Sequence, residues 1–470
     1  MTTPNNLSRR LFLQRAAVGT LMATGGSTLL AACASGGTDD NTGGGGADKT
    51  ADNPFGVNKA DPLDVVIFKG GYGDDYAKFH ESLYKKKFSA AEVKHAGITD
   101  IRQQLQPRFN SGNPPDVIDN SGAQQLPLAT LADTGQLADL TPLFDTESID
   151  GGKIRDTLNP VAVEAGDYGG KVLVLNYALE VYGLWYDKTL FDKKGWKPAE
   201  TWADFLALCE EIKGAGIAPM AHQGKYPYYI QQVTMDMAVK HGGKEVVTAI
   251  DSLEPNAWKH PSVKMAAEAL LEIKSKGYML QGTEGLDHIQ SQTRWNEGKA
   301  AFIPSGSWLE NEQKKIAPKE FATTVAPTPL MEGSKLPFQS TRVSAAEAFI
   351  VPAKAKNVPG GQEYLRIMLS KEGASKFTEL TAAPTVVTGA GEGLDLTPAA
   401  ASASELVKAG GDNNWNYYYF VWYSPMRPKV ETAFGELAAG RVTADEFCAA
   451  CQKAADETAK DPQTKKRTRG

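Results

Sequence analysis

The chain has 470 residues, 41% of them hydrophobic and 23% charged, which is the composition of a soluble globular protein with room for two domains. The formal net charge of −6 becomes −9 when residues 1–32, with three arginines and no acid, are set aside (47 basic against 56 acidic residues). This acidic balance, without a basic stripe, argues against nucleic acid as a partner.

Two export signals overlap at the N-terminus. Residues 8–13, SRRLFL, are typical of a twin-arginine signal, and an apolar stretch rich in small residues follows. It ends in LAAC at residues 30–33, which resembles a bacterial lipobox, whose cysteine receives a lipid. A transmembrane anchor is the weaker alternative, because glycine and threonine interrupt a run shorter than about 20 apolar residues. We predict a signal peptide over residues 1–32, a lipidated Cys33 and a location on the outer face of the cell membrane.

Residues 33–60 are mostly Gly, Ser, Thr, Asp and Asn. Such a segment buries little apolar surface and is expected to be a flexible tether.

The first predicted strand, LDVVIF at residues 63–68, leads into the turn KGGYG. This turn lacks the GxGxxG spacing of a dinucleotide loop, so we interpret it as backbone brought close to a ligand. Lys69, Gly71 and Tyr72 are its candidate binding residues.

A helix containing Ile101, Leu105 and Phe109 is followed by a short strand at residues 116–118. The polar residues Asp119, Asn120 and Ser121 come directly after this strand. Polar residues at the ends of successive strands predict a doubly wound α/β lobe with its site at the edge of the sheet.

Residues 172–188, VLVLNYALEVYGLWYDK, form an apolar strand with a polar interruption that includes Glu180. Polar groups inside so apolar a strand are costly unless they are paired or face a cleft. We therefore predict that this strand crosses between two lobes and that Glu180 lies in the gap. An amphipathic helix follows, with Thr201 as its N-cap and Cys209 on its apolar face.

Aromatic residues mark the second half of the chain. Tyr226 and Tyr228 belong to KYPYY, where three tyrosines surround a proline, and Trp308 follows a predicted strand in the segment GKAAFIPSGSW. Tyrosine rings with a solvated hydroxyl suit a sugar. The cluster NNWNYYYFVWY at residues 413–423 is too dense for one strand face. Its candidates for the cleft are Trp415 and Tyr417, while Phe420 and Trp422 are assigned to packing.

Residues 345–351, AAEAFIV, predict a second crossing strand. Cys448 and Cys451 form a CxxC pair in an alanine-rich helix, without a second pair or a nearby histidine to indicate zinc. A disulfide between them stays open. The basic residues 465–469 are expected to be a solvated end of the chain.

The sequences of these segments resemble those of the extracellular solute-binding proteins of sugar ABC importers, a family that is similar to maltose-binding protein. SGNPPDV, the strand that continues into YDK…LF…G…TW, and above all GKAAF…GSW carry the resemblance. Within this family the chain is similar to actinobacterial lipoproteins that bind N-acetylglucosamine and N,N′-diacetylchitobiose.

The resemblance implies a type II, two-lobe periplasmic-binding-protein fold, in which each lobe is a sheet flanked by helices and several strands form the hinge. We expect the first lobe at residues 61–177 plus 345–390, the second at 178–344 plus 391–460, and a basic tail at 461–470. The family also implies that Trp308 stacks on the sugar, that a membrane permease is the partner, that the protein is a monomer, and that it needs no cofactor or metal.

Three alternatives are weighed against this interpretation. A binding protein for a cello- or malto-oligosaccharide would share all the same features. A secreted glycoside hydrolase would need two carboxylates about 5 to 9 Å apart, for which Asp119 and Glu180 are the candidates. A surface receptor that feeds a signalling partner would use the same cleft.

Overall fold

The structure, a computed structural model, describes residues 47–122 and 124–469. The predicted signal peptide and Cys33 lie outside these residues. No helix in the described part is long and apolar enough to cross a membrane. The strands are β1 (Leu63–Phe68), β2 (Val93–Ile98), β3 (Val117–Asp119), β4 (Leu175–Asp187), β5 (Ala218–Met220), β6 (Ala300–Gly306), β7 (Thr323–Ala326) and β8 (Val343–Ile350).

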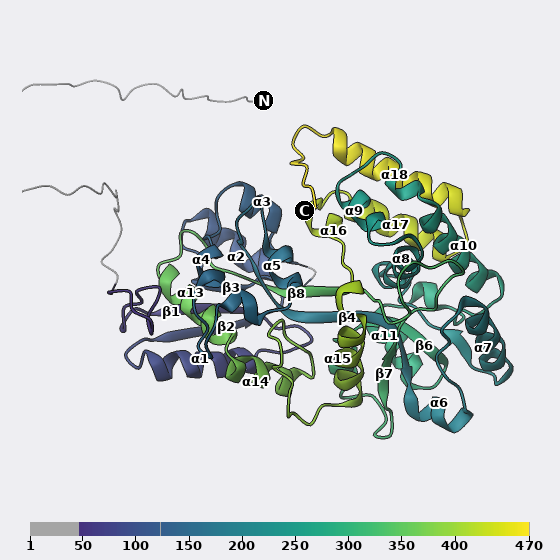
Figure 1. Ribbon diagram of the computed structural model, residues 1–470, viewed down its shortest axis with the longest axis horizontal. Helices are drawn as coiled ribbons and strands as arrows, with labels where there is room; N and C mark the ends of the chain where they lie inside the picture. Colours follow the sequence, from purple (N-terminus) through teal and green to yellow (C-terminus); the bar gives the residue numbers. More distant parts are fainter. Residues whose placement is uncertain (1–46, 123, 470) are drawn as a thin grey trace, which may run out of the picture. The chain divides into compact units, whose positions relative to one another are not determined.

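The helices cover both halves of this sheet (Figure 1). They are α1 (Asp75–Lys87), α2 (Ile101–Asn110), α3 (Leu128–Asp133), α4 (Thr141–Asp145), α5 (Val161–Gly166), α6 (Lys188–Lys194), α7 (Trp202–Gly214), α8 (Tyr228–Gly242), α9 (Glu245–Asp251), α10 (Pro261–Ser275), α11 (His288–Asn296), α12 (Leu309–Gln313), α13 (Val358–Met368), α14 (Lys371–Thr381), α15 (Pro398–Gly410), α16 (Tyr419–Trp422), α17 (Arg427–Ala438) and α18 (Ala444–Lys460). Short 3₁₀ turns are η1 (Ile154–Thr157), η2 (Ala257–Lys259), η3 (Thr283–Gly285) and η4 (Gly411–Asn413).

The long strand β4 belongs to both halves of the molecule. Strands follow the order β2-β1-β3-β8-β4-β6-β5, and β7 also pairs with β4. The first part of β4 runs antiparallel to β8, and its second part pairs with β6 and β7. In Figure 1, β4 and β8 run through the middle, between two groups of helices. The prediction that residues 172–188 form a crossing strand is therefore confirmed, and β8 is the second crossing.

One half of the molecule, the first lobe, has a core on each face of its sheet. Leu63, Val65 and Ile67 of β1 pack against α1 and α13, whereas Val66 packs against α2 on the opposite face. Alternate side chains of a strand point to opposite faces, so a parallel sheet covered on both sides needs continuous apolar strands. The two cores draw on residues 55–179 and 343–390.

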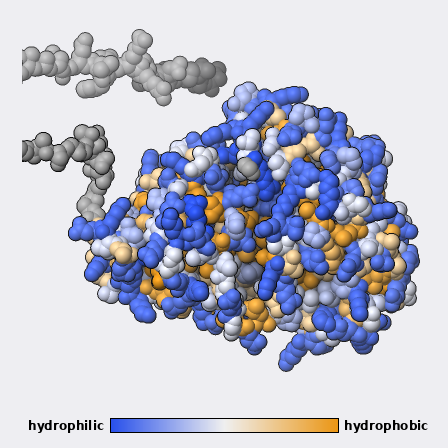
Figure 2. Space-filling view, viewed as in Figure 1, coloured by the Kyte–Doolittle hydropathy of each residue, from blue (hydrophilic) through white to orange (hydrophobic). Residues whose placement is uncertain are grey.

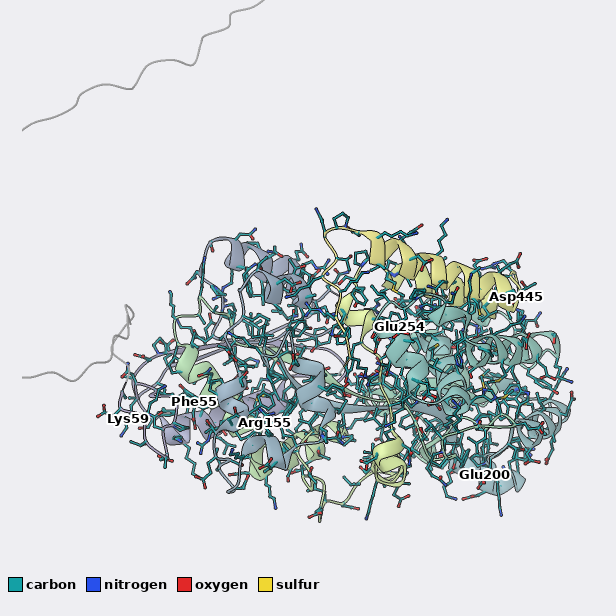
Figure 3. All side chains as sticks on the ribbon, turned by 45° about the horizontal axis from the view of Figure 1, so that its top comes forward. Phe55, Lys59, Arg155, Glu200, Glu254 and Asp445 are labelled. Carbon is teal, nitrogen blue, oxygen red and sulfur yellow. The ribbon has the colours of Figure 1, made fainter. Side chains whose placement is uncertain are left out.

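The other half, the second lobe, continues the same alternation along β4. Leu184 and Tyr186 enter a core formed with α7, α8, α10, α17 and α18, while Val181 and Trp185 pack against α11 and α15. These cores draw on residues 181–326 and 399–455. Figure 3 shows Phe55 and Arg155 on the first lobe, and Glu200, Glu254 and Asp445 on the second. The expected α/β two-lobe fold is confirmed.

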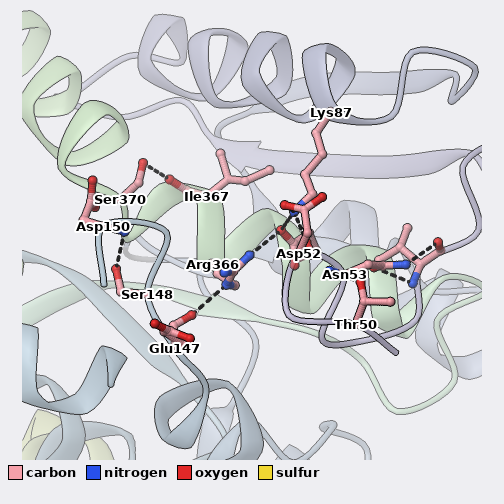
Figure 4. A network of polar contacts seen from close by, with 12 residues as sticks. Thr50, Asp52, Asn53, Lys87, Glu147, Ser148, Asp150, Arg366, Ile367 and Ser370 are labelled. Atoms are coloured by element: carbon pink, nitrogen blue, oxygen red, sulfur yellow. Dashed lines mark hydrogen bonds and ion pairs between the residues drawn. The ribbon is translucent and has the colours of Figure 1, made fainter. Parts of the chain in front are cut away.

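Residues 47–60, predicted to be part of a flexible tether, make contacts with the first lobe. Phe55 is 7% exposed and Val57 is fully buried, both in the core of the first lobe. Lys87 of α1 pairs with Asp52 (3.3 Å) and with the buried Glu363 (3.0 Å), in the network that Figure 4 shows. Phe55 and Val57 thus belong to the packed part of the chain.

Local details of the second lobe agree with the sequence. Thr201 caps α7 by accepting a hydrogen bond from the Asp204 amide, as predicted. Cys209 is a buried free thiol, and burial raises its pKa to about 12. Cys448 and Cys451 are also free and buried in α18.

Candidate functional site

The Glu180 carboxylate, in the polar interruption of β4, accepts hydrogen bonds at the junction of the lobes. The Tyr182 hydroxyl donates to Glu180 Oε2 (2.5 Å) and accepts from the Tyr228 hydroxyl (2.9 Å). Ser344 Oγ of β8 donates to the same carboxylate oxygen at 3.3 Å. Burial raises the pKa of Glu180, although the Tyr182 hydrogen bond and the nearby Arg342 oppose this shift. Glu180 therefore sits at the crossing, as expected.

Arg342, just before β8, supplies the positive charge of this region. Its guanidinium lies between the rings of Tyr182 and Tyr417, 4.1 Å from each ring centroid. It donates from Nε to Asn416 Oδ1 (2.9 Å) and from Nη1 to Gln232 Oε1 (2.6 Å). A planar guanidinium stacks on aromatic faces while its edge donates hydrogen bonds. Arg342 thereby holds Tyr182, and through it the Glu180 carboxylate, in place.

A pair of carboxyls, Asp119 and Glu347, lies where β3 meets β8. Asp119 is fully buried and accepts from the Tyr76 hydroxyl (2.9 Å) and from Ser121 Oγ (2.5 Å). Burial raises the pKa of Asp119 to about 6. Burial, and then the charge of Asp119, raise the pKa of Glu347 well above its usual value. Two adjacent carboxyls in a site with little water favour a shared proton, so this pair offers both a donor and an acceptor near neutral pH.

Glu347 has an unusual backbone. Its φ is +52°, a left-handed conformation that costs a non-glycine residue energy and that clusters at functional sites. The regular β4–β8 pairing includes Ala346 and Ala348 but omits Glu347. This local irregularity places the carboxyl at the junction, beside Asp119, instead of in the regular alternation of β8.

Tyr72, in the turn after β1, is a residue of the first lobe that lies near Glu180 and Glu347. Burial raises the pKa of its hydroxyl, and the charges of Glu180, Glu347 and Glu312 add to the shift. The hydroxyl has no hydrogen-bond partner of good geometry among the described residues. Because Glu312 belongs to α12 of the second lobe, Tyr72 stands where the lobes face each other.

The two lobes touch near this turn. A Cβ placed on Gly71 would lie 3.9 Å from the Glu312 side chain, and the Asn311 amide of α12 donates to the Thr381 carbonyl of α14. The two lobes are thus in contact, and we refer to this arrangement as the closed one.

The second lobe contributes a row of aromatic rings. Trp308, half-buried, meets Tyr182 edge-on at 5.5 Å between centroids and lies 6.1 Å from Tyr229. Tyr228 continues the row toward Phe420, 5.5 Å away. The Trp308 indole rests on Gly306, where a Cβ would come within 2.0 Å of the ring. Gly306 thus leaves the space that the indole occupies.

We name Tyr72, Asp119, Glu180, Tyr182, Trp308 and Glu347 the hinge cluster. It joins aromatic rings, of which those of Tyr72 and Trp308 are half-buried, to carboxyls and hydroxyls. Such a set suits a neutral ligand with apolar faces and several hydroxyl or amide groups. The described residues include no group of three or more His, Cys, Asp or Glu that could hold a metal ion.

Several predicted residues lie beside the hinge cluster in supporting roles. Ser121 orients Asp119 and accepts from the Ala348 amide at 3.0 Å. Asn120 is fully buried, and its amide group bonds both backbone groups of Leu126. Lys69 is largely exposed and pairs with Asp74 at 3.2 Å.

The remaining aromatic candidates are either buried in the core of the second lobe or exposed at its surface. Trp415 is 3% exposed and donates from Nε1 to Asp236 (2.7 Å), and Tyr417 is 1% exposed. Both belong to the core of the second lobe, although we had expected them to line the cleft, and Tyr417 reaches the hinge through Arg342. Phe420, expected to be packing, is half-buried beside Tyr228. Tyr226 is 48% exposed, with its ring against His288.

Sequence reasoning missed Tyr182, Arg342 and Glu347. One signal was present, because Glu347 interrupts an apolar strand in the same way as Glu180 does. The pairing of β8 with both β3 and β4, which makes that interruption meaningful, is visible only in the fold.

Comparison with known proteins shows the family to which the chain belongs. The family of bacterial extracellular solute-binding proteins matches residues 70–375, which include both crossing strands and all six residues of the hinge cluster. The chain belongs to the bacterial extracellular solute-binding proteins.

This solute-binding protein is 35% identical over 423 residues to the diacetylchitobiose-binding protein NgcE of Streptomyces coelicolor, covering 89% of each chain. Its fold is similar to that of apo RafE from Streptococcus pneumoniae, with a TM-score of 0.69, 17% identity, and coverage of 86% of this chain and 99% of the other. A solved chitin oligosaccharide binding protein gives a TM-score of 0.66 at 18% identity, covering 84% of this solute-binding protein and 98% of that chain.

Proposed function

We propose that this protein is the substrate-binding component of an ABC importer and that it captures N-acetylglucosamine, N,N′-diacetylchitobiose or a related chitooligosaccharide. The observation that carries the ligand class is the 35% identity, over 89% of both chains, with a protein named for diacetylchitobiose binding. The hinge cluster supports the same class, because it combines half-buried rings with carboxyls and hydroxyls.

The chemistry of the hinge cluster fits an amino sugar in three respects. The Trp308 ring offers an apolar surface for the C–H face of a pyranose. The Tyr72 hydroxyl, for which the described residues offer no hydrogen-bond partner of good geometry, would bond a sugar hydroxyl or the acetamido group. Burial and the neighbouring Asp119 raise the pKa of Glu347 well above its usual value, so the Glu347 carboxyl can keep its proton and donate a hydrogen bond to a neutral ligand.

Ligand capture would work through the two crossing strands. The hinge cluster takes Tyr72 from the first lobe and Trp308 from the second, so a sugar bound there touches both. Only a ligand that contacts both lobes stabilises the closed arrangement more than an open one. A permease that recognises the closed shape would then accept loaded protein without contacting the sugar.

A hydrolase is the competing class, with Asp119 and Glu180 as its carboxyl pair. Both Asp119 oxygens are already engaged, by Tyr76 and by Ser121, and the residue is fully buried. A general acid or nucleophile must reach the scissile bond. We therefore propose binding without catalysis.

Calorimetric titration tests the ligand. We expect saturable binding of N,N′-diacetylchitobiose or its longer homologues, and weak or no binding of cellobiose and maltose. Tight binding of either of those two sugars would instead assign the protein to cello- or malto-oligosaccharides. Shortened products after incubation with chitooligosaccharides would contradict the binding-only proposal.

Gly306→Ala tests the position of the indole without removing it. The new methyl group must push the Trp308 ring away, and we expect roughly tenfold weaker sugar binding with little loss of stability. Titration and thermal unfolding measure the two effects. Gly214→Ala is the matched control, because an added Cβ there meets nothing within 4 Å. Unchanged affinity in Gly306→Ala would mean that this ring position does not matter for binding.

Anchoring is a separate part of the proposal. We propose that a twin-arginine signal exports the protein and that a lipid on Cys33 holds it, as a monomer, beside its permease. Cys33→Ser removes the acceptor thiol, so we expect nearly all of the protein to move from the membrane fraction to the medium and to carry no acyl mass. A variant that still carries acyl mass and partitions into detergent would refute lipidation at Cys33.

A further inference from the structure

The basic residues after α18 are packed against both lobes. They were expected to be solvated, but the Arg467 side chain is only 8% exposed and that of Arg469 only 13%. From α18 the chain runs back beside α16 (Figure 1). Figure 2 shows hydrophilic residues over most of the face in this view, with apolar patches among them.

Arg467 links α3 of the first lobe to the segment after α16 of the second. Its Nη2 lies 3.1 Å from Asp133 Oδ1, and its guanidinium stands 4.9 Å from the Tyr168 ring centroid, both in the first lobe. Its backbone amide donates to the Tyr423 hydroxyl (3.0 Å), which belongs to the second lobe. Lys465 adds a longer pair with Asp133 at 3.4 Å.

Arg469 makes a second link of the same kind. It donates from Nε to Glu164 of α5 at 2.9 Å, in the first lobe. Its Nη1 donates to the Asn416 carbonyl (2.6 Å) and to Asp251 Oδ2 (3.3 Å), both in the second lobe. The guanidinium also lies 4.9 Å from the Tyr418 ring centroid.

Asp251 gives this link a specific partner. It is fully buried and accepts the backbone amides of Tyr418 (2.8 Å) and Tyr419 (2.7 Å). Burial raises the pKa of Asp251 to about 7, and the Arg469 charge opposes the rise. A buried carboxylate needs a counter-charge, and among the described residues Arg469 forms an ion pair with Asp251.

We infer that residues 465–469 form an inter-lobe strap that stabilises the closed arrangement of the two lobes. The crossing strands allow the hinge to move, whereas the strap must detach from one lobe before the lobes separate. Both arginines bridge the lobes, so both sets of contacts are lost together on opening. The strap therefore shifts the equilibrium toward closure before any ligand binds.

The direct test uses small-angle scattering of the ligand-free full chain. Arg467→Ala/Arg469→Ala should have a larger radius of gyration than wild type at low salt. Raising the salt from about 20 mM to about 500 mM should expand wild type toward the variant and leave the variant unchanged, because ion pairs are screened. Arg441→Ala is the control, since it breaks an Arg–Glu pair confined to the second lobe (2.8 Å to Glu436).

A second arm depends on the proposed function. The double variant should bind N,N′-diacetylchitobiose roughly five- to tenfold more weakly than wild type. Without the strap, a smaller fraction of the ligand-free protein is in the closed arrangement, so part of the binding free energy is used to close the lobes. If wild type binds no chitooligosaccharide, the proposed ligand is wrong, while the scattering result still decides the strap.

Asp133→Asn/Glu164→Gln is a second test of the strap, to be used if Arg467→Ala/Arg469→Ala does not fold. It removes the strap's carboxylate partners on the first lobe but leaves the buried Asp251–Arg469 pair in place, so the second lobe should stay stable. If both double variants fold and match wild type in radius and salt response, the strap inference is overturned.

Discussion

Trp308→Ala is expected to weaken binding of N,N′-diacetylchitobiose by at least roughly thirtyfold, since truncation of an aromatic residue at a binding hot spot costs about 2 kcal/mol or more. The indole is half-buried at the junction of the lobes, in edge contact with Tyr182 and supported by Gly306. A ring held in this way loses little entropy when a sugar stacks on it. Titration calorimetry measures the affinity, and thermal unfolding measures the stability.

The control for this experiment is another half-buried tryptophan. Trp202 of α7 stacks on Phe205 and donates to Glu272 (3.0 Å), and neither partner belongs to the hinge cluster. Trp202→Ala should lose stability and keep its affinity. If Trp308→Ala behaves in the same way, the indole is a packing residue. If neither affinity nor stability changes in Trp308→Ala, both interpretations fail.

Asp236→Ala is expected to destabilise the protein by about 3–5 kcal/mol, because it leaves a buried ammonium without its partner. Lys240 is fully buried in α8, 3.1 Å from Asp236 Oδ2, and also donates to the Thr328 carbonyl (2.8 Å). The same carboxylate accepts the Trp415 indole N–H. Urea unfolding measures the loss in free energy.

The matched control has the same spacing on the surface. Lys188 and Asp192 of α6 form an exposed pair four residues apart at 2.7 Å, and Asp192→Ala should cost at most about 0.5 kcal/mol. Asp236→Ala/Lys240→Met should recover much of the lost stability, since it removes the orphaned charge. Equal losses in Asp236→Ala and Asp192→Ala would contradict the argument from burial.

The pH dependence of Asp236→Ala follows from the same burial. Desolvation lowers the pKa of Lys240, and the Asp236 charge opposes this shift. Without Asp236 the pKa in the folded state falls further below its value in the unfolded chain, so the unfolded state binds more protons. The stability of the variant should therefore rise with pH as the folded lysine loses its proton. A destabilisation that is equal at pH 6 and pH 9 would contradict this account.

Local patterns in the sequence identified the crossing strand, since a strand of this kind depends on short-range periodicity. Residues 172–188 are apolar on both sides of a polar interruption, and β4 occupies nearly the same range. Glu180 could be identified from its neighbours in the sequence alone, because burying a carboxyl in an apolar strand costs free energy unless the carboxyl is paired or faces a cleft. Glu347 has the same property, but its significance depends on β3, more than two hundred residues earlier.

The side-chain partners of other residues were beyond the reach of such patterns. Asn120 and Trp415 each stand beside polar residues, as binding residues often do, yet Leu126 and Asp236 engage their side chains. Arg467 and Arg469 look like a solvated basic end because their acidic partners are 334, 305 and 218 residues away in the chain. Only the fold brings these charges together.

The antiparallel pairing of β3 with β8, Ile118 opposite Ile350, also bears on how the chain is made. The ribosome releases β3 long before β8, and at about 5–20 residues per second the delay is on the order of 10–50 s. During that time the sheet of the first lobe has an open edge beside β3 and lacks the helices α13 and α14 that cover it. The nascent chain must therefore be shielded from aggregation until residue 390 has emerged, and any export route that carries folded protein has to wait as long.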